Sequence, residues 1–124
     1  MEAIETDDAP AAIGPYSQGV VDGERIFVSG QGPVDPVSGD IVSGDISEQT
    51  ARTLENVAAV LEAVNASLAD VVKSTVFLTD MANYDAANEV YAEYMTDPFP
   101  ARSAVAVADL PIDIGVEIEV VASR

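Results

Sequence analysis

Arg102 opens an otherwise small and apolar segment, FPARSAVAV, in a chain with only five Lys and Arg residues against 22 Asp and Glu. A guanidinium grips a carboxylate through two parallel hydrogen bonds, so an arginine with open space beside it can act as an anion clamp. Pro100, two residues upstream, favours a fixed entry into a strand. The alternative is an ordinary surface pair with one of the many carboxylates, which contributes little to stability. The residues alone leave both interpretations open.

Two glutamates near the C-terminus are the candidates for proton transfer. Glu117 and Glu119 alternate with apolar residues in VEIEV, so both side chains are expected on the same face of a strand. One can be an ordinary solvated residue, while a carboxylate turned into a cleft could orient or activate a water molecule. The alternation does not choose between them.

Four further residues are candidates for contacts with a small ligand, and each also has an ordinary structural explanation. Tyr16, in GPYSQG, can be a packing aromatic with its hydroxyl in water. Ser29 and Gly30 close a predicted strand, where glycine allows close approach of a ligand but a simple turn explains it equally well. Asn88, on a predicted helix, can be an exposed amide.

The composition limits the chemistry that these residues can support. The chain has no His and no Cys, which removes the usual Ser-His-Asp and Cys-His machinery and the ordinary zinc ligand sets. The loop GQGPVD matches neither the dinucleotide-binding fingerprint nor a P-loop, and the aspartates of the same region lack the spacing of an EF-hand. We therefore expect no metal and no cofactor, with proton transfer left to carboxylate, tyrosine, Lys73 or bound water.

The formal net charge of −17 limits the partners in the same way. Binding to nucleic acid or to anionic lipid relies on Lys and Arg, so neither partner is expected. No apolar run approaches the length of a membrane span, the N-terminus lacks a secretory signal, and the absence of cysteine favours a cytoplasmic location.

The acidic residues are spread over the whole chain, which suggests the hypothesis of a halophilic origin, with self-repulsion screened by concentrated salt. We then expect the free energy of unfolding to fall as salt is withdrawn. Denaturant unfolding at several salt concentrations measures this, and unfolding that is no easier at low salt would count against the hypothesis.

The hydrophobic pattern predicts the elements that position these residues. Residues 1–16 are expected to be irregular, because Pro10, Gly14 and Pro15 interrupt them. Period-two and period-3.6 patterns predict strands and helices in the order strand, strand, helix, strand, helix, strand, strand. Their ranges are strands Gln18–Val21 and Arg25–Ser29, a helix over 46–67, a strand over 71–78, a helix over 83–95, and strands Ser103–Ala108 and Val116–Ala122.

The first helix carries its expected apolar stripe on Leu54, Val57, Ala58, Leu61 and Val64. Together these elements predict an α+β fold with a single domain over residues 1–124, a mixed sheet backed by two helices. No third helix is available for the other sheet face, so oligomerisation through that face is expected.

Six segments in order make the chain similar to a known family over essentially its whole length. They are APAAIGPYSQGV, FVSGQGPVDPVSG, EQTARTLENV, VVKSTVFLTDMANYDAANEVYAEY, FPARSAVAVADLP and VEIEVVA. They resemble the RidA (YjgF) family, the reactive intermediate deaminases. The resemblance implies a chorismate-mutase-like fold and a homotrimer with sites between subunits. It also implies hydrolysis of 2-imino or 2-enamino acids to 2-keto acids and ammonia without a cofactor.

The resemblance also assigns roles to individual positions. The carboxylate-binding arginine of the family falls on Arg102, and the glutamate associated with water falls on Glu117. The remaining substrate contacts fall on Tyr16, Ser29, Gly30 and Asn88. Many relatives have cysteine two residues after the arginine, where this chain has Ala104, so thiol-dependent side chemistry is doubtful here. A non-catalytic module that binds small carboxylates remains the alternative function, because a fold does not guarantee an activity.

Overall fold

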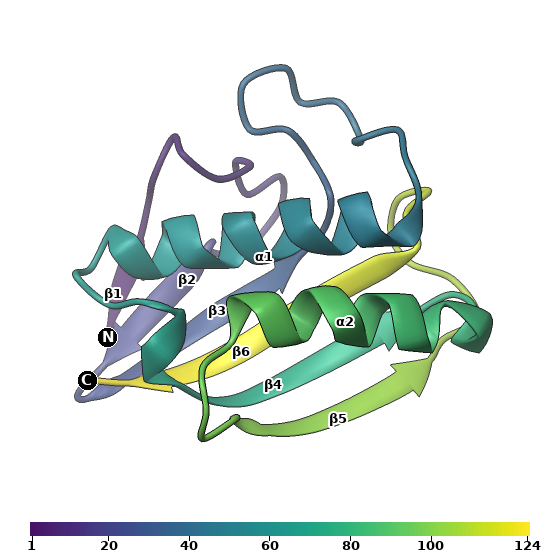
Figure 1. The fold of residues 1–124 in the computed structure, drawn as a ribbon. Helices are drawn as coiled ribbons and strands as arrows, with labels where there is room; N and C mark the ends of the chain where they lie inside the picture. Colours follow the sequence, from purple (N-terminus) through teal and green to yellow (C-terminus); the bar gives the residue numbers. More distant parts are fainter.

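A hairpin and two helical connections build one six-stranded mixed sheet, in the strand order β1-β2-β3-β6-β4-β5 (Figure 1). The computed structural model describes all of residues 1–124. The strands are β1 (Glu2–Ile4), β2 (Gly19–Asp22), β3 (Arg25–Gln31), β4 (Val71–Leu78), β5 (Ala101–Ala106) and β6 (Val116–Ser123). The helices are α1 (Ile46–Glu62) and α2 (Tyr84–Tyr94), with short 3₁₀ turns at Leu68–Asp70 and Met81–Asn83. The predicted α+β class is confirmed.

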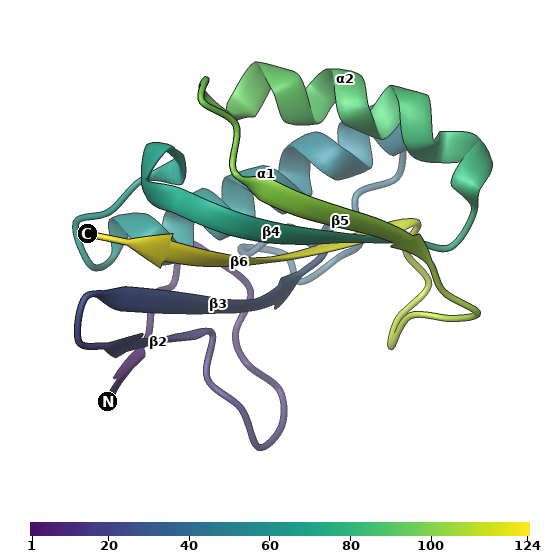
Figure 2. The same cartoon turned by 90° about the horizontal axis from the view of Figure 1, so that it is seen from below.

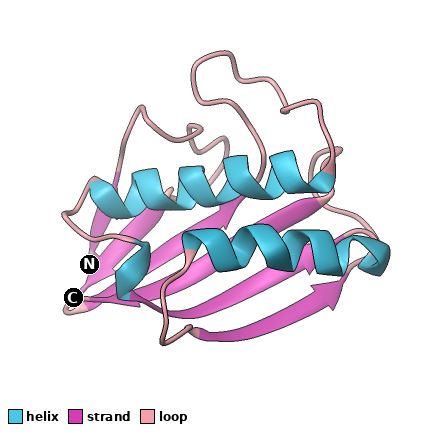
Figure 3. Cartoon of the chain, in the orientation of Figure 1, coloured by secondary structure: helices cyan, strands magenta, loops and turns pink.

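The strand directions follow from the connections. β1, β2 and β3 form an antiparallel meander, and β6 pairs antiparallel with both β3 and β4. β4 and β5 are parallel neighbours, because α2 carries the chain back between them (Figure 3). This parallel pairing places Arg102 on β5 opposite Ser74 on β4. β5 is consequently the edge strand of the sheet on that side.

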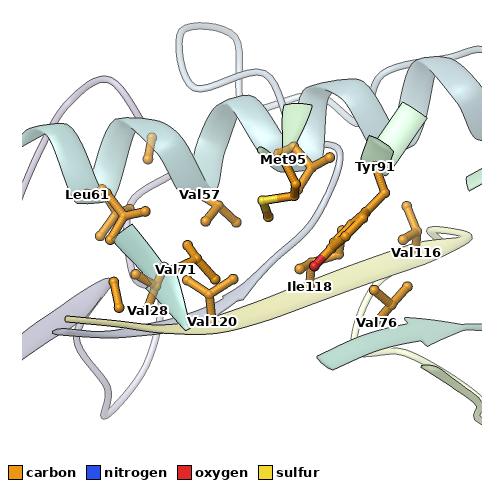
Figure 4. Close-up of a cluster of buried hydrophobic side chains, with 14 of the residues drawn as sticks. Val28, Val57, Leu61, Val71, Val76, Tyr91, Met95, Val116, Ile118 and Val120 are labelled. Carbon is orange, nitrogen blue, oxygen red and sulfur yellow. The ribbon is translucent and has the colours of Figure 1, made fainter. Parts of the chain in front are cut away.

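The core lies between the sheet and the two helices (Figure 4). Leu54, Val57, Val60 and Leu61 of α1 are fully buried. Val60 was not part of the predicted stripe, and the predicted Ala58 and Val64 are only partly buried. Asp45 caps α1 by accepting a hydrogen bond from the backbone N–H of Glu48 at 3.0 Å. No helix is long and apolar enough to cross a membrane.

The predicted elements differ from the structure most at β1, at the end of α1 and at the start of β5. The helix predicted over 46–67 ends at Glu62, because the chain turns at residues 63–65, where Asn65 has a positive φ of 62°. Glu2–Ile4 form a short strand, although residues 1–16 were expected to be irregular, because they pair with β2 along its free edge. β5 runs over Ala101–Ala106 rather than Ser103–Ala108, because pairing with β4 begins opposite Lys73, directly after Pro100. This earlier start makes Arg102 a full member of the edge strand.

Both helices cover the same face of the sheet, and the other face carries no helix (Figure 2). Val116, Ile118 and Val120 of β6 are buried toward the helices, so Glu117 and Glu119 project from the opposite face. Phe27 and Val105 leave 43% and 41% of their surface exposed. The uncovered face that the pattern predicts is therefore present, and its apolar side chains suit a protein contact.

Candidate functional site

Arg102 lies on the helix-covered side of the edge strand, below α2. Its Nη2 donates a hydrogen bond to the Tyr84 hydroxyl at 3.1 Å. Its guanidinium carbon lies 4.8 Å from the centre of the Tyr91 ring and 5.7 Å from that of Tyr84. Both distances are within the range of cation–π attraction. Two aromatic rings of α2 thus hold the guanidinium.

No carboxylate pairs with this arginine. The structure has one ion pair, between Arg52 and Glu55 on the surface of α1, with 3.3 Å between Nη1 and Oε1. The Arg102 guanidinium makes a single hydrogen bond to the protein, to the Tyr84 hydroxyl. Arg102 therefore does not form the ordinary surface ion pair that the sequence left open. Its other N–H groups are available to an anionic ligand, which a guanidinium binds through two parallel bonds.

The surroundings of Arg102 are closed on the inner side and open on the outer side. The inner side packs against the core through Val76, Ala104 and Ile118 and leaves no room for a water molecule. On the outer side a hollow of about 290 Å³ opens at the β5 edge. Its lining residues are Asn88, Tyr91, Ala92, Phe99, Pro100 and Arg102. Arg102 and Asn88, two of the predicted site residues, therefore line one hollow.

Glu117 occupies the opposite face of the sheet. It lies on β6 across from Phe77 of β4, on the side that no helix covers. Burial, and secondarily the neighbouring charge of Glu119, raises the pKa of Glu117 above its usual 4.5. A raised pKa makes this carboxylate a stronger proton acceptor than an exposed glutamate, which suits a role in acid–base catalysis.

Gly30 makes room for the Glu117 carboxylate. The pairing of β3 with β6 shifts between Val28 and Gln31, and Gly30 lies within this irregularity. A Cβ atom at Gly30 would lie 2.5 Å from Oε2 of Glu117 and 2.7 Å from its carboxyl carbon. Real Cβ atoms essentially never approach so closely, so the space rather than an unusual φ requires glycine here.

Replacing Gly30 by alanine should therefore move Glu117 while sparing the fold. The displaced group is the far end of a flexible side chain, so we expect a small change in thermal stability. If Glu117 is catalytic, we expect kcat to fall about tenfold or more, because misplacement of a reacting group by 1 Å is costly. Steady-state kinetics and thermal unfolding measure the two effects. In a Glu117→Gln background the same substitution should change nothing further, and an additional loss there would contradict this role for Gly30.

Ser29 and Tyr16 belong to the same end of the sheet as Gly30. The Ser29 hydroxyl donates to the carbonyl oxygen of Ser17 at 2.6 Å, which fastens the segment carrying Tyr16 to β3. Tyr16 is 53% exposed, and its hydroxyl accepts a hydrogen bond from the N–H of Ile13 at 3.2 Å. Gln18 anchors the preceding loop through hydrogen bonds to Thr6, Ala9 and Pro10.

The predicted site residues consequently form two groups. Arg102 and Asn88 lie on the helix side of the β5 edge, whereas Glu117, Gly30 and Ser29 lie on the β3–β6 side of the sheet. The sheet itself separates the guanidinium from the Glu117 carboxylate within one chain.

The family model described as "Endoribonuclease L-PSP" matches residues 6–124. The chain belongs to this family, also known as RidA/YjgF. It is 47% identical over 126 residues to the 2-iminobutanoate/2-iminopropanoate deaminase of Salmonella typhimurium, covering 99% of this chain and 98% of the relative. It is 52% identical over 123 residues to a RutC family protein of Pyrococcus horikoshii, with coverage of 99% and 98%.

Solved structures of RidA/YjgF proteins have the same fold. TdcF of E. coli, with bound serine, is similar at a TM-score of 0.94 and 45% identity, covering 100% of this chain and 99% of that one. RidA from the Antarctic bacterium Psychrobacter is similar at a TM-score of 0.96 and 42% identity, covering 100% of both chains. The resemblance that the six sequence segments indicate is therefore confirmed.

Three residues around Arg102 were not among the candidates from the sequence. Tyr84 and Tyr91 belong to the helix predicted over 83–95, but nothing in the sequence marked them as neighbours of the arginine. Ser74, in the middle of β4, gave no signal at all, yet its hydroxyl bonds to that of Tyr91. The spacing of seven residues between the two tyrosines places them on one helix face, and only the β4–β5 pairing shows what that face covers.

Proposed function

We propose that this RidA/YjgF chain is a cofactor-independent deaminase that hydrolyses reactive 2-imino or 2-enamino acids to 2-keto acids and ammonia. Bacterial relatives with this activity in their names align with it from end to end at 45% to 47% identity. The RutC family proteins of Pyrococcus carry no such name, so family membership alone does not decide the substrate. The surroundings of Arg102 give more specific support for a substrate with a carboxylate.

The observation that carries the proposal is a guanidinium held only by neutral groups. The substrates proposed here and their keto-acid products all bear a carboxylate next to the reacting carbon. Arg102 offers unoccupied N–H groups at the rim of an open hollow, with no acid of its own chain to compete for them. A bidentate bond from Arg102 would fix the carboxylate and hence the position of C2.

The proposed active form is a homotrimer whose sites lie between subunits. The separation of Arg102 from Glu117 by the sheet supports this arrangement, because two neighbouring copies can bring together groups that lie on opposite faces of one sheet. The helix-free face, which bears Glu117 and exposed apolar side chains, is the surface that a neighbouring copy would cover. The edge strand β5 would bring its Arg102 to that neighbour.

In the proposed mechanism, Glu117 activates a water molecule and then returns the proton. The water oxygen attacks C2 of the protonated imine as the carboxylate takes a proton from the water, and the electron pair of the C=N bond moves to nitrogen to give a neutral carbinolamine. Glu117 next protonates the amino group of this carbinolamine. The C–N bond breaks with its electron pair on ammonia, while the hydroxyl passes its proton to the Glu117 carboxylate and becomes the keto group. An enamine must first gain a proton at C3 to become the imine.

The remaining candidates orient the substrate. Tyr16 and the backbone at Ser29 and Gly30 would line one wall of the site, with Asn88 on the other. No metal or cofactor takes part in this scheme. Free imines already hydrolyse in water, so positioning and one acid–base group, worth about 10²–10⁴-fold, suffice for a useful enzyme.

A non-catalytic trimer that binds small carboxylates is the second candidate. One observation favours it: the similar TdcF structure contains bound serine, a small amino acid that is not an imine. Arg102 would serve binding and catalysis equally, whereas the carboxyl group of Glu117 with its raised pKa is needed only for catalysis. Ribonuclease activity, which the family description names, fits poorly with a net charge of −17, because RNA binding requires basic side chains.

A coupled assay tests the proposal. A purified serine or threonine dehydratase generates the imine, and the rate of keto-acid release is measured with and without this protein. We expect faster release with the parent. Arg102→Lys should lower kcat/KM about tenfold or more, because lysine keeps the charge but loses the two-bond geometry. Arg25→Lys is the matched control, since Arg25 lies at the exposed hairpin end and bonds only Ser123.

The outcomes separate the two candidate functions. Acceleration that Arg102→Lys leaves unchanged would overturn the clamp assignment. Keto-acid binding in calorimetry without any acceleration would overturn the deaminase in favour of the binding module.

A further inference from the structure

Tyr91 is a tyrosine whose position is fixed at both ends. Its backbone belongs to α2, and its hydroxyl forms a hydrogen bond of 2.5 Å with the hydroxyl of Ser74 on β4. Tyr91 is 6% exposed and Ser74 is 1% exposed, so water does not compete for this bond. Figure 4 shows the ring reaching from the helix down toward the sheet. The ring therefore has one orientation.

The guanidinium carbon of Arg102 lies 4.8 Å from the centre of the Tyr91 ring, closer than to the Tyr84 ring. A ring face attracts a cation without accepting its N–H bonds in the way that a carboxylate does. The Tyr84 hydroxyl takes one N–H from the side. The other N–H groups stay free for a ligand, while the plane of the guanidinium is defined.

We propose that Tyr91 is a positioning residue for Arg102, and that the buried bond to Ser74 sets the orientation of its ring. This inference rests on the proposed function only in taking Arg102 as the group that binds the substrate carboxylate. Tyr91 touches no reacting atom in this scheme. It acts on ligand affinity and KM, whereas the proton transfers of Glu117 on the neighbouring subunit determine kcat.

Three substitutions distinguish the effect of the Tyr91 ring on ligand binding from that of its hydrogen bond to Ser74. Tyr91→Leu removes the ring, and we expect keto-acid binding in calorimetry to weaken about tenfold. Tyr91→Phe and Ser74→Ala each remove the same hydrogen bond and keep the ring. We expect both to weaken binding by the same smaller factor, and the double variant to be no weaker than either single one. Tyr94→Phe is the control, because the Tyr94 hydroxyl bonds to Glu55, away from Arg102.

An NMR measurement reads the Arg102–Tyr91 contact independently of activity. A ring face shifts the side-chain N–H resonance of an arginine above it upfield, and Arg102 is the one arginine that lies over an aromatic ring. We expect this shift in the parent and in Tyr91→Phe, and a much smaller shift in Tyr91→Leu, where only the more distant Tyr84 ring remains. If the parent shows the shift but neither binds nor converts ligand, the proposed function fails and the contact stands.

The proposal is overturned by either of two results. One is the absence of the shift in the parent. The other is a Tyr91→Leu variant that is folded by its amide spectrum and binds keto acid as tightly as the parent. Unequal effects of Tyr91→Phe and Ser74→Ala, or additive effects in the double variant, would overturn the part assigned to the buried bond.

Discussion

Mixing inactive Arg102→Gln subunits with inactive Glu117→Gln subunits in equal amounts is expected to restore about one quarter of the parent activity. In the proposed trimer each site takes its guanidinium from one subunit and its carboxylate from the next. Half of the sites then receive an intact Arg102, and half of those also receive an intact Glu117. The measurement is keto-acid release after the two variants are unfolded and refolded together, compared with each variant refolded alone.

A second mixture provides the control. When the parent is refolded with the Arg102→Gln/Glu117→Gln double variant, sites shared between subunits again give about one quarter of the full activity. Sites contained within single chains would instead give about one half, and the first mixture would then recover nothing. Light scattering on the same samples reports whether the assembly has three subunits. If neither mixture recovers about one quarter of the full activity, the proposal of a site shared between subunits is contradicted.

Replacing Glu117 by glutamine is expected to lower kcat by about 10²–10⁴-fold, the usual contribution of one acid–base group. Glutamine keeps the shape of the side chain but cannot carry a proton. Keto-acid affinity should stay close to that of the parent, because the carboxylate of the ligand binds Arg102. Single-turnover kinetics and calorimetry measure the two quantities. A variant that retains full kcat would show that Glu117 is not the base.

The raised pKa of Glu117 sets the direction in which activity and stability change with pH. The base must be ionised, so parent kcat/KM should rise through a pKa above 4.5 and then level off. Removing the neighbouring charge by Glu119→Gln should move this rise to lower pH, whereas the distant Glu24→Gln should not. A rise that stays in place in Glu119→Gln would contradict the assigned cause.

The raised pKa of Glu117 also makes the free energy of unfolding depend on pH. A carboxyl group whose pKa is higher in the folded state favours folding below its unfolded pKa, and loses that contribution as the pH rises through the folded pKa. Glu117→Gln should therefore raise the free energy of unfolding relative to the parent at neutral pH, and bring no such gain in acid. Denaturant unfolding at both pH values checks this, and a loss of stability at neutral pH would contradict it.

The sequence predicted the pieces of the site better than their arrangement. Alternation along VEIEV placed Glu117 and Glu119 on one face, as the structure confirms, but did not indicate which of them is partly buried. That depends on the shifted pairing of β3 with β6, which puts Gly30 beside Glu117. Register shifts of this kind arise from packing across strands that are distant in the chain.

The side on which Arg102 lies was also beyond prediction. An isolated strand segment shows which residues share a face, but not which face the helices cover. The parallel pairing of β4 with β5 and the packing of α2 above them decide this, and both are contacts between distant segments. The short strand β1 was missed for a similar reason, since three residues carry too little pattern to indicate a strand.

The neutral surroundings of Arg102 set a limit on how acidic this protein can become. Its surface carries 22 acidic residues, and an additional one would be tolerated at most exposed positions. An aspartate or glutamate in place of Asn88 or Ala92, however, would be a carboxylate permanently attached at the rim of the hollow. At the roughly millimolar effective concentration of a tethered group, it would occupy the guanidinium as an inhibitor built into the chain. However acidic the rest of the surface becomes, the rim of this hollow must therefore stay free of added carboxylates.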